Sequence, residues 1–235
     1  MDDGDLVKTK NFSNQRYIGD PINAVKIFNE KKVDELTIFD ISCSVRNSCI
    51  DFDLLSDIAK EARMPLCYGG GVNDPLLALE LVKMGFEKVS LSSHALDNPE
   101  LLDESSSKVG SQSIVLTVDY KINNGDINIF INRGNKKLNL NFESLIYLIN
   151  HQKIGEVIFN SIDLDGTASG MDLSLARMIK DRLSCQITFS GGVGSIEHMQ
   201  QMIDIINPVG IAAGSFFVFH GINRAVLISY AKPQI

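Results

Sequence analysis

A pattern of turns in the first half of the chain recurs in the second half at a nearly fixed distance. Three pairs of positions match in the same order, at separations of 121, 122 and 123 residues: Gly70 and Gly191, Ser93 and Ser215, and Asp40 and Asp163. An internal repeat of this length indicates that one supersecondary arrangement is used twice. We therefore predict two equivalent half-barrels, at about residues 1–110 and 111–235.

Short β-branched runs alternate with amphipathic stretches along the chain, which is typical of βα units around a parallel sheet. The predicted strands are Glu35–Ile41, Pro65–Gly69, Lys88–Ser92, Ser113–Asp119, Glu156–Ile162, Gln186–Ser190 and Val209–Ala213. The predicted helices are Pro21–Lys31, Phe52–Ala62, Pro75–Met84, Phe142–Asn150, Leu173–Arg182 and Ile196–Ile206, the first and third opened by Asp-Pro pairs. The segment Asp126–Leu140 is predicted to form a hairpin.

The repeat also predicts a strand ahead of Met1. The second half opens with Ser113–Asp119, and the equivalent segment about 122 positions earlier falls before Met1. We therefore expect an α/β fold, a single (β/α)8 TIM-barrel domain over residues 1–235 whose strand 1 is missing from this chain. Either the start has been placed too late or the barrel is open at one seam. Because an open seam leaves strand edges unpaired, we expect this chain to express poorly or aggregate.

Composition narrows the classes of function. The chain has 22 basic and 29 acidic side chains and a net charge of −7, so nucleic acid is a poor partner. It has no apolar run near the roughly 20 residues that span a membrane and no signal peptide, so we expect a cytoplasmic protein with no membrane partner. The four cysteines, Cys43, Cys49, Cys67 and Cys185, and the four histidines are scattered, so we expect no metal and no cofactor.

Glycine-rich turns follow several predicted strands. In a TIM barrel the active site lies at the carboxyl ends of the strands, and glycines let backbone N–H groups approach phosphate oxygens. Two such sites on opposite sides of the mouth predict an elongated small-molecule substrate with a phosphate at each end; the alternative is tight turns with no ligand. The candidate residues are Gly70, Gly71 and Ser93 for one site, and Ser190, Gly191, Gly192, Gly214 and Ser215 for the other.

Asp119 ends an apolar run, so its carboxylate is predicted to lie at the mouth between the two phosphate sites, placed for general acid or base chemistry. The alternative is an ordinary aspartate that caps a loop. Asp165 and Gly166 begin a polar loop after another predicted strand, which is suited to closing over a ligand. Asp40, at the end of its own strand, is a weaker candidate.

Three charged residues, Glu35, Lys88 and Glu156, stand at the starts of predicted strands, on the face opposite the mouth. If they point inward, they form a charged ring around the barrel axis. General residue statistics favour the other interpretation, in which they point outward into solvent.

Taken together, these motifs resemble the cyclase subunit of imidazole glycerol phosphate synthase, a barrel of histidine biosynthesis. The resemblance covers essentially the whole chain. It rests on Gly19-Asp20-Pro21, Asp34-Glu35-Leu36, Asp40-Ile41, Gly69-Gly70-Gly71-Val72, Lys88-Val89-Ser90, Gly110-Ser111-Gln112-Ser113, Ser161-Ile162-Asp163-Leu164-Asp165-Gly166-Thr167, Ser190-Gly191-Gly192 and Ala213-Gly214-Ser215-Phe216.

The resemblance implies a heterodimer with a glutaminase subunit on the barrel floor. Ammonia released there would pass a gate, with Glu35, Lys88 and Glu156 among its members, and attack a bisphosphorylated ribulosyl-aminoimidazole. The products would be imidazole glycerol phosphate and aminoimidazole carboxamide ribotide. The resemblance makes Asp119 one of two acid/base aspartates and, by matching Lys8 to the family's lysine, implies that Lys8 is also catalytic. The second aspartate would directly precede Met1, and without it we expect cyclisation to be crippled.

Two alternatives stay open at this stage. Other segments, such as Leu6-Val7-Lys8-Thr9 and Met64-Pro65-Leu66-Cys67-Tyr68, look more like relatives found with surface-polysaccharide genes. Those relatives are thought to deliver ammonia for amidine formation on a nucleotide-activated sugar. The other alternative is a catalytically impaired scaffold that binds phosphate and a glutaminase without turnover.

Overall fold

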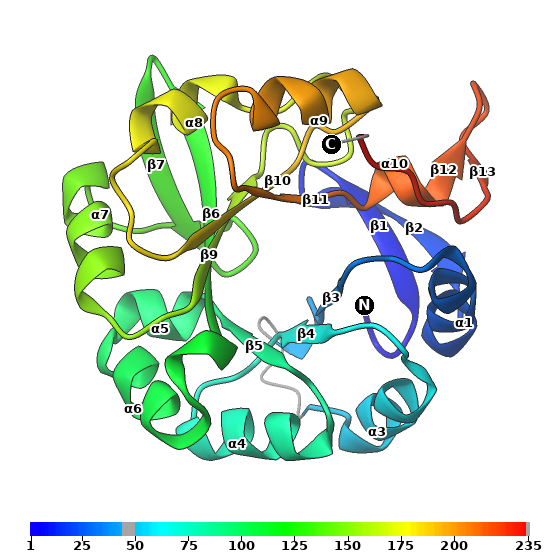
Figure 1. Cartoon of the computed structure of the whole chain (residues 1–235), viewed down its shortest axis with the longest axis horizontal. Helices are drawn as coiled ribbons and strands as arrows, with labels where there is room; N and C mark the ends of the chain where they lie inside the picture. The colour runs from blue at the N-terminus through cyan, green and yellow to red at the C-terminus, as the bar shows by residue number, and fades with distance from the viewer. Residues whose placement is uncertain (44–49, 234–235) are drawn as a thin grey trace.

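Seven parallel strands form one curled sheet in the computed structural model, which describes residues 1–43 and 50–233 (Figure 1). Their order across the sheet is β11-β10-β9-β6-β5-β4-β3. They are β3 (Leu36–Phe39), β4 (Leu66–Gly69), β5 (Lys88–Leu91), β6 (Ile114–Asn123), β9 (Glu156–Ser161), β10 (Gln186–Ser190) and β11 (Gly210–Ala212). Each predicted strand is present and the helices lie outside the sheet, which confirms an α/β fold of the TIM-barrel type.

The helices begin where side chains can cap them. Asp20 and Asp74 each accept a backbone N–H of the helix that follows and precede a proline at its first position, as the sequence predicts. The longer helices are α1 (Pro21–Lys31), α3 (Phe52–Glu61), α4 (Pro75–Met84), α6 (Glu100–Val109), α7 (Phe142–His151), α8 (Leu173–Ile179) and α9 (Ile196–Ile203). Two short helices, α5 (Ser93–Asp97) and α10 (Ser215–Val218), follow β5 and β11. In residues 1–43 and 50–233, no helix has the length and apolarity needed to cross a membrane.

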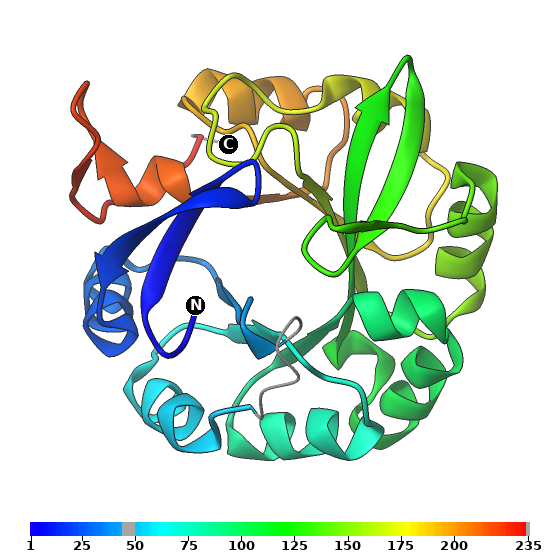
Figure 2. The ribbon, with the colours of Figure 1, turned by 180° about the vertical axis from the view of Figure 1, so that it is seen from behind.

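The sheet does not close by strand pairing within the described residues, because β11 and β3 have no hydrogen-bonded strand between them. An antiparallel hairpin, β1 (Leu6–Lys10) and β2 (Ser13–Gly19), lies at this opening (Figures 1 and 2). The amino group of Met1 donates to the carbonyl of Phe39, and the N–H of Ile41 donates to the Met1 carbonyl. This is the bonding of a parallel neighbour of β3, so Met1 lies in the position of a strand residue beside Asp40.

The chain packs its apolar side chains in two places. Inside the curled sheet, Cys67, Val115 and Ile158 form a small buried cluster with Phe39 packed against it. The much larger cluster lies between the outer face of the sheet and the helices, and includes Leu55, Leu81, Leu102, Leu145 and Leu175. Because the interior cluster is small, polar side chains fill the rest of the barrel at both of its ends.

The repeat seen in the sequence is also a repeat of contacts. A Cβ atom added to Gly70 would lie 2.5 Å from the carbonyl oxygen of Asp40, and one added to Gly191 would lie 2.9 Å from that of Ser161. The two glycines, and the two strand ends that they touch, are each 121 positions apart. The equivalent of Asp40 is therefore Ser161, and the match of Asp40 to Asp163 was wrong.

The strand carrying Asp119 is longer than predicted. Strand β6 continues to Asn123 and pairs antiparallel with β7 (Asp126–Ile131), which in turn pairs with β8 (Lys136–Lys137). Asn124 and Gly125 join β6 to β7 with φ angles of +53° and +87°. Two successive left-handed residues of the type Asn-Gly are the signature of a tight hairpin turn. The predicted hairpin over Asp126–Leu140 is thus one half of a longer antiparallel unit that projects beyond the barrel.

The Asn124–Gly125 turn gives a test of this unit. We expect Gly125→Val to lower the free energy of unfolding by about 1–2 kcal/mol, because a β-branched residue is strained at positive φ. A Cβ at Gly125 would meet no atom within 4 Å, so a steric clash with other residues cannot cause the loss of stability. Gly125→Asn is the matched control, since asparagine tolerates this conformation. Equal urea midpoints for the two variants would contradict a left-handed turn at Asn124 and Gly125.

Candidate functional site

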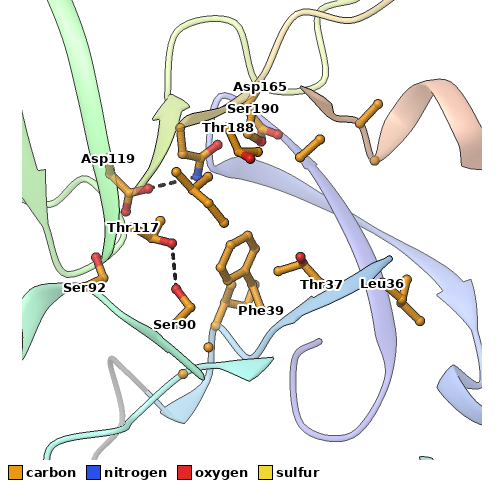
Figure 3. A pocket seen from close by; sticks show the side chains of 18 of the residues that line it. Leu36, Thr37, Phe39, Ser90, Ser92, Thr117, Asp119, Asp165, Thr188 and Ser190 are labelled. Carbon is orange, nitrogen blue, oxygen red and sulfur yellow. Dashed lines mark hydrogen bonds between the residues drawn. The ribbon is translucent and has the colours of Figure 1, made fainter. Parts of the chain in front are cut away.

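A cavity of about 580 Å³ runs through the inside of the curled sheet from its floor to its mouth (Figure 3). Glu35 and Glu156 line it where the strands begin, and Asp119, Ser92 and Ser190 line it where they end. Phe217 and Tyr230 line the part of the cavity that extends toward the opening between β3 and β11. One continuous space therefore connects the two ends of the barrel.

Asp119 lies at the mouth, directly across from Asn160 on the neighbouring strand β9. The Asn160 side-chain amide donates to Asp119 Oδ1 at 2.9 Å (Figure 3). Burial raises the pKa of Asp119 to about 7; the hydrogen bond from Asn160 works against this rise, and the negative charge of Asp165 adds to it. A carboxyl group that titrates near neutrality can take up and release a proton during a reaction at physiological pH.

Lys8 comes to the mouth from the hairpin strand β1. Burial lowers the pKa of Lys8, and the charge of Asp165 partly opposes that shift. A Cβ atom at Gly214 would lie 2.2 Å from Lys8 Nζ, so the amine lies directly against this glycine. The structure therefore brings Lys8 against the turn that precedes Ser215, one of the predicted phosphate sites.

The loop that begins with Asp165 and Gly166 is fastened to the same hairpin. Asp165 Oδ2 accepts hydrogen bonds from Thr9 Oγ1 at 2.6 Å and from the N–H of Phe12 at 3.2 Å. A Cβ at Gly166 would lie 2.4 Å from the Thr9 carbonyl oxygen. Part of the Asp165 carboxylate is thus engaged by the protein itself, and its contact with a substrate stays a prediction.

The residues of the second half that are predicted to bind phosphate lie together. Ser190, Gly191, Gly192, Gly214 and Ser215, together with Asp165 and Gly166, line a small cavity of about 30 Å³ beside the main one. Gly192 has a φ angle of +87°, and a Cβ there would lie 1.8 Å from the Gly170 carbonyl oxygen. Glycine is therefore required for this turn to close against the loop that follows β9.

The first-half candidates also face the cavity. Gly70, Gly71 and Ser93 line the mouth near the ends of β4 and β5. Ser93 Oγ accepts a hydrogen bond from the N–H of Asn132 at 3.0 Å, so the hydroxyl also holds the β7–β8 turn in place. This second role was not predicted from the sequence.

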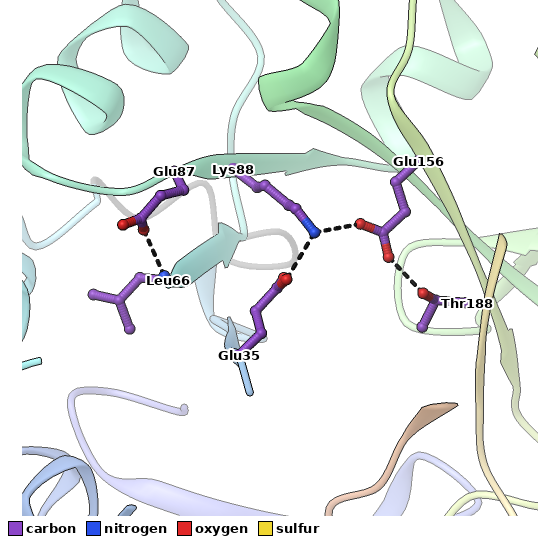
Figure 4. Close-up of polar contacts among 6 residues, drawn as sticks. All are labelled: Glu35, Leu66, Glu87, Lys88, Glu156 and Thr188. Atoms are coloured by element: carbon purple, nitrogen blue, oxygen red, sulfur yellow. Dashed lines mark hydrogen bonds and ion pairs between the residues drawn. The ribbon is translucent and has the colours of Figure 1, made fainter. Parts of the chain in front are cut away.

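The charged residues at the floor point inward (Figure 4). Lys88 Nζ lies 2.7 Å from Glu35 Oε2 and 2.7 Å from Glu156 Oε2, and Thr188 Oγ1 donates to Glu156 Oε1 at 2.5 Å. Burial opposes the charge of Lys88, but the hydrogen bonds to Glu156 and Glu35 raise its pKa above the ordinary value. The outward interpretation that residue statistics favour is wrong here, because the strands begin in the register that turns these three side chains toward the axis.

Several polar residues of the interior were not singled out in the sequence. Asn160 holds Asp119, Thr188 holds Glu156, and Ser90 Oγ lies 2.6 Å from Thr117 Oγ1 (Figure 3). The signal available for them was alternation, since inward-facing positions on parallel strands recur every second residue. Among the described residues, no group of three or more His, Cys, Asp or Glu side chains is arranged to hold a metal ion. Cys49 lies outside the described residues.

The chain matches the family of histidine biosynthesis proteins over residues 1–223. It is similar to a protein of Leptospira borgpetersenii named "Putative imidazole glycerol phosphate synthase subunit HisF", with 41% identity over 232 residues, 98% of this chain and 91% of the relative. It is also similar to the "Imidazole glycerol phosphate synthase subunit HisF" of a Thermotoga species, with 33% identity over 232 residues, 99% of this chain and 91% of the relative.

The pKa of Asp119 predicts a pH-dependent stability. The folded state keeps a proton on Asp119 that the unfolded chain, with an ordinary value of 3.8, releases, so the wild type loses stability as pH rises from about 4 to about 7. We expect Asp119→Asn to raise Tm relative to wild type by a margin that widens over this interval to about 8–16 °C and is constant above it. A margin that does not change with pH, as we expect for the exposed control Asp126→Asn, would contradict this.

The floor cluster predicts a large cost for removing its cation. Lys88→Met leaves Glu35 and the buried Glu156 without their partner, and we expect a loss of about 2–4 kcal/mol in the free energy of unfolding. Lys60→Met removes the exposed pair of Lys60 and Asp57 and should cost about 1 kcal/mol or less. Urea denaturation measures both free energies of unfolding. Similar losses for the two variants would show that Lys88 stabilises the fold no more than an exposed ion pair does.

Proposed function

The chain belongs to the family of histidine biosynthesis proteins, and on that premise we propose that it is the cyclase subunit of an imidazole glycerol phosphate synthase. The observation that carries this proposal is the position of Asp119. Its carboxyl group titrates near neutrality and lies in one cavity with two glycine-lined turns. A proton donor and acceptor between two anion sites suits a long substrate that is phosphorylated at both ends.

In the proposed reaction, ammonia attacks a bisphosphorylated ribulosyl-aminoimidazole at the mouth of the barrel. The substrate is cleaved and cyclised to imidazole glycerol phosphate and aminoimidazole carboxamide ribotide with release of one water molecule, which makes the enzyme a carbon–nitrogen lyase. Asp119 exchanges protons with the reacting centre. Lys8 and the turns at Gly191, Gly192 and Gly214 bind one phosphate group, while the Gly70–Gly71 turn and Ser93 bind the other.

Ammonia in this proposal comes from a glutaminase subunit that docks on the floor of the barrel. The continuous cavity between floor and mouth supports such a route. Glu35, Lys88 and Glu156 form the gate at its entrance, and passage of ammonia requires the Lys88 bridge to move aside. The reaction with free ammonium salt bypasses this partner, so the barrel can be tested alone.

The test is turnover of the bisphosphorylated ribulosyl-aminoimidazole with excess ammonium salt, with both products identified by mass spectrometry. The chain is assayed as it is, and a cooperative melt shows that it is folded. Ammonium-dependent formation of both products supports the proposal. If the folded chain gives neither product, the proposal is wrong.

Asp119→Asn is expected to lower kcat about 100- to 10,000-fold in this assay, since the amide cannot exchange a proton with the substrate. The matched control is Asp126→Asn, an exposed aspartate on β7, which should keep the wild-type rate. Equal rates for wild type and Asp119→Asn would exclude Asp119 from the chemistry.

The comparisons do not favour the two alternatives. The names of the relatives refer to imidazole glycerol phosphate synthase, and neither name refers to sugar amidation. The near-neutral pKa of Asp119 favours the cyclase over the impaired scaffold, because an acid/base residue needs such a pKa.

A further inference from the structure

The turn between β7 and β8 presents an arginine to the mouth of the barrel. Asn132, Arg133 and Gly134 have φ angles of +53°, +57° and +78°, so three successive residues are left-handed. The turn is held from two sides. The N–H of Asn132 donates to Ser93 Oγ at 3.0 Å, and a Cβ at Gly134 would lie 3.1 Å from Ile162 Cδ1.

Arg133 has no anionic partner within the protein. Its side chain lines the main cavity and is half-buried. Among residues 1–43 and 50–233, no carboxylate forms an ion pair with its guanidinium group and no acceptor takes a hydrogen bond from it. A partly desolvated cation without a counter-charge is costly, and a bound anion that accepts two guanidinium hydrogen bonds relieves that cost.

Arg133 and Lys8 are attached to different walls of the mouth, and the Arg133 turn also reaches the hairpin that carries Lys8, since a Cβ at Gly134 would lie 3.6 Å from Phe12 Cδ2. Lys8 Nζ lies against Gly214, which follows β11, while the Arg133 turn is fixed to Ser93, which follows β5. Strands β11 and β5 are four steps apart in the sheet order. In a barrel with eight positions, four steps are half of the circumference.

The two halves of the chain supply these cations differently. The turn that carries Arg133 has an equivalent 121 positions earlier, at Asn11 and Phe12, where both φ angles are also positive. There the arginine is replaced by Phe12, and the cation is Lys8 on the preceding strand. The backbone conformation of the turn is repeated in the two halves, but the position of the positively charged residue is not. The shape of the turn therefore does not require an arginine at position 133.

We propose that Arg133 binds the second phosphate group of a bisphosphorylated substrate, on the side of Gly70, Gly71 and Ser93. Lys8 binds the first phosphate group, and the pair makes the site select ligands that are anionic at both ends. The inference rests on the proposed function, because it assigns a residue to one end of the proposed substrate. Its test does not require turnover.

The test is calorimetric titration with two probes, a linear diol phosphorylated at both ends and the same diol phosphorylated at one end. We expect wild type to prefer the bisphosphate at least tenfold. Arg133→Gln should weaken bisphosphate binding about 10- to 100-fold and leave monophosphate binding unchanged. Arg133→Lys should lose less, because it keeps the charge but not the planar fork. Arg177→Gln, on the exposed face of α8, is the matched control and should bind both probes as wild type does.

The outcomes separate this inference from the proposed function. If wild type shows no preference for the bisphosphate, or if Arg133→Gln keeps the preference while melting as wild type does, the inference is wrong. If Arg133→Gln is unstable, the same comparison is made with Arg133→Lys, and undiminished preference for the bisphosphate there overturns it. If the preference depends on Arg133 but no imidazole product forms, the inference stands and the proposed reaction falls.

Discussion

The ion cluster at the floor joins side chains from four segments of the barrel wall. Lys88 on β5 bridges Glu35, which precedes β3, and Glu156 on β9, and Glu156 also accepts a hydrogen bond from Thr188 on β10. Four segments of the wall are thus joined by side chains at the point where the strands begin. A small apolar layer lies above this cluster and separates the polar groups of the floor from those of the mouth. The charged groups of the floor have partners of opposite charge, whereas those of the mouth are less completely paired.

The mouth has the opposite character. Asp119 is held by one amide and keeps a pKa near 7, Lys8 is buried against a glycine, and Arg133 has no counter-charge within the described residues. Groups left in this state make the empty site less stable than it could be. Asp119→Asn is expected to stabilise the protein at neutral pH, and Arg133 lacks an anion. Both are what we expect if these side chains bind a ligand.

The sequence predicted the βα order well because its signals are local. β-Branched runs identified the strands, and the Asp-Pro pairs identified the starts of α1 and α4. The direction in which strand side chains point was less predictable, since a shift of one residue in strand register turns a side chain from the inside of the barrel to the outside. For that reason residue statistics gave the wrong direction for Lys88 and its partners. Asp40 was matched to Asp163 by residue type, whereas the contacts of Gly70 and Gly191 identify Ser161. Arg133 lies in a turn whose left-handed backbone is only partly signalled by its neighbours Asn132 and Gly134.

We infer that one substrate spans the mouth with its reacting atoms beside Asp119. A crystal structure with the bisphosphorylated ribulosyl-aminoimidazole bound in the absence of ammonia tests it most directly. We predict one phosphate group at the Gly191–Gly192 and Gly214 turns, the other at Gly70, Gly71 and Arg133, and an Asp119 oxygen within about 3.2 Å of a substrate atom that exchanges a proton. A substrate with both phosphate groups on one side of the mouth, or with Asp119 out of reach, would contradict the account.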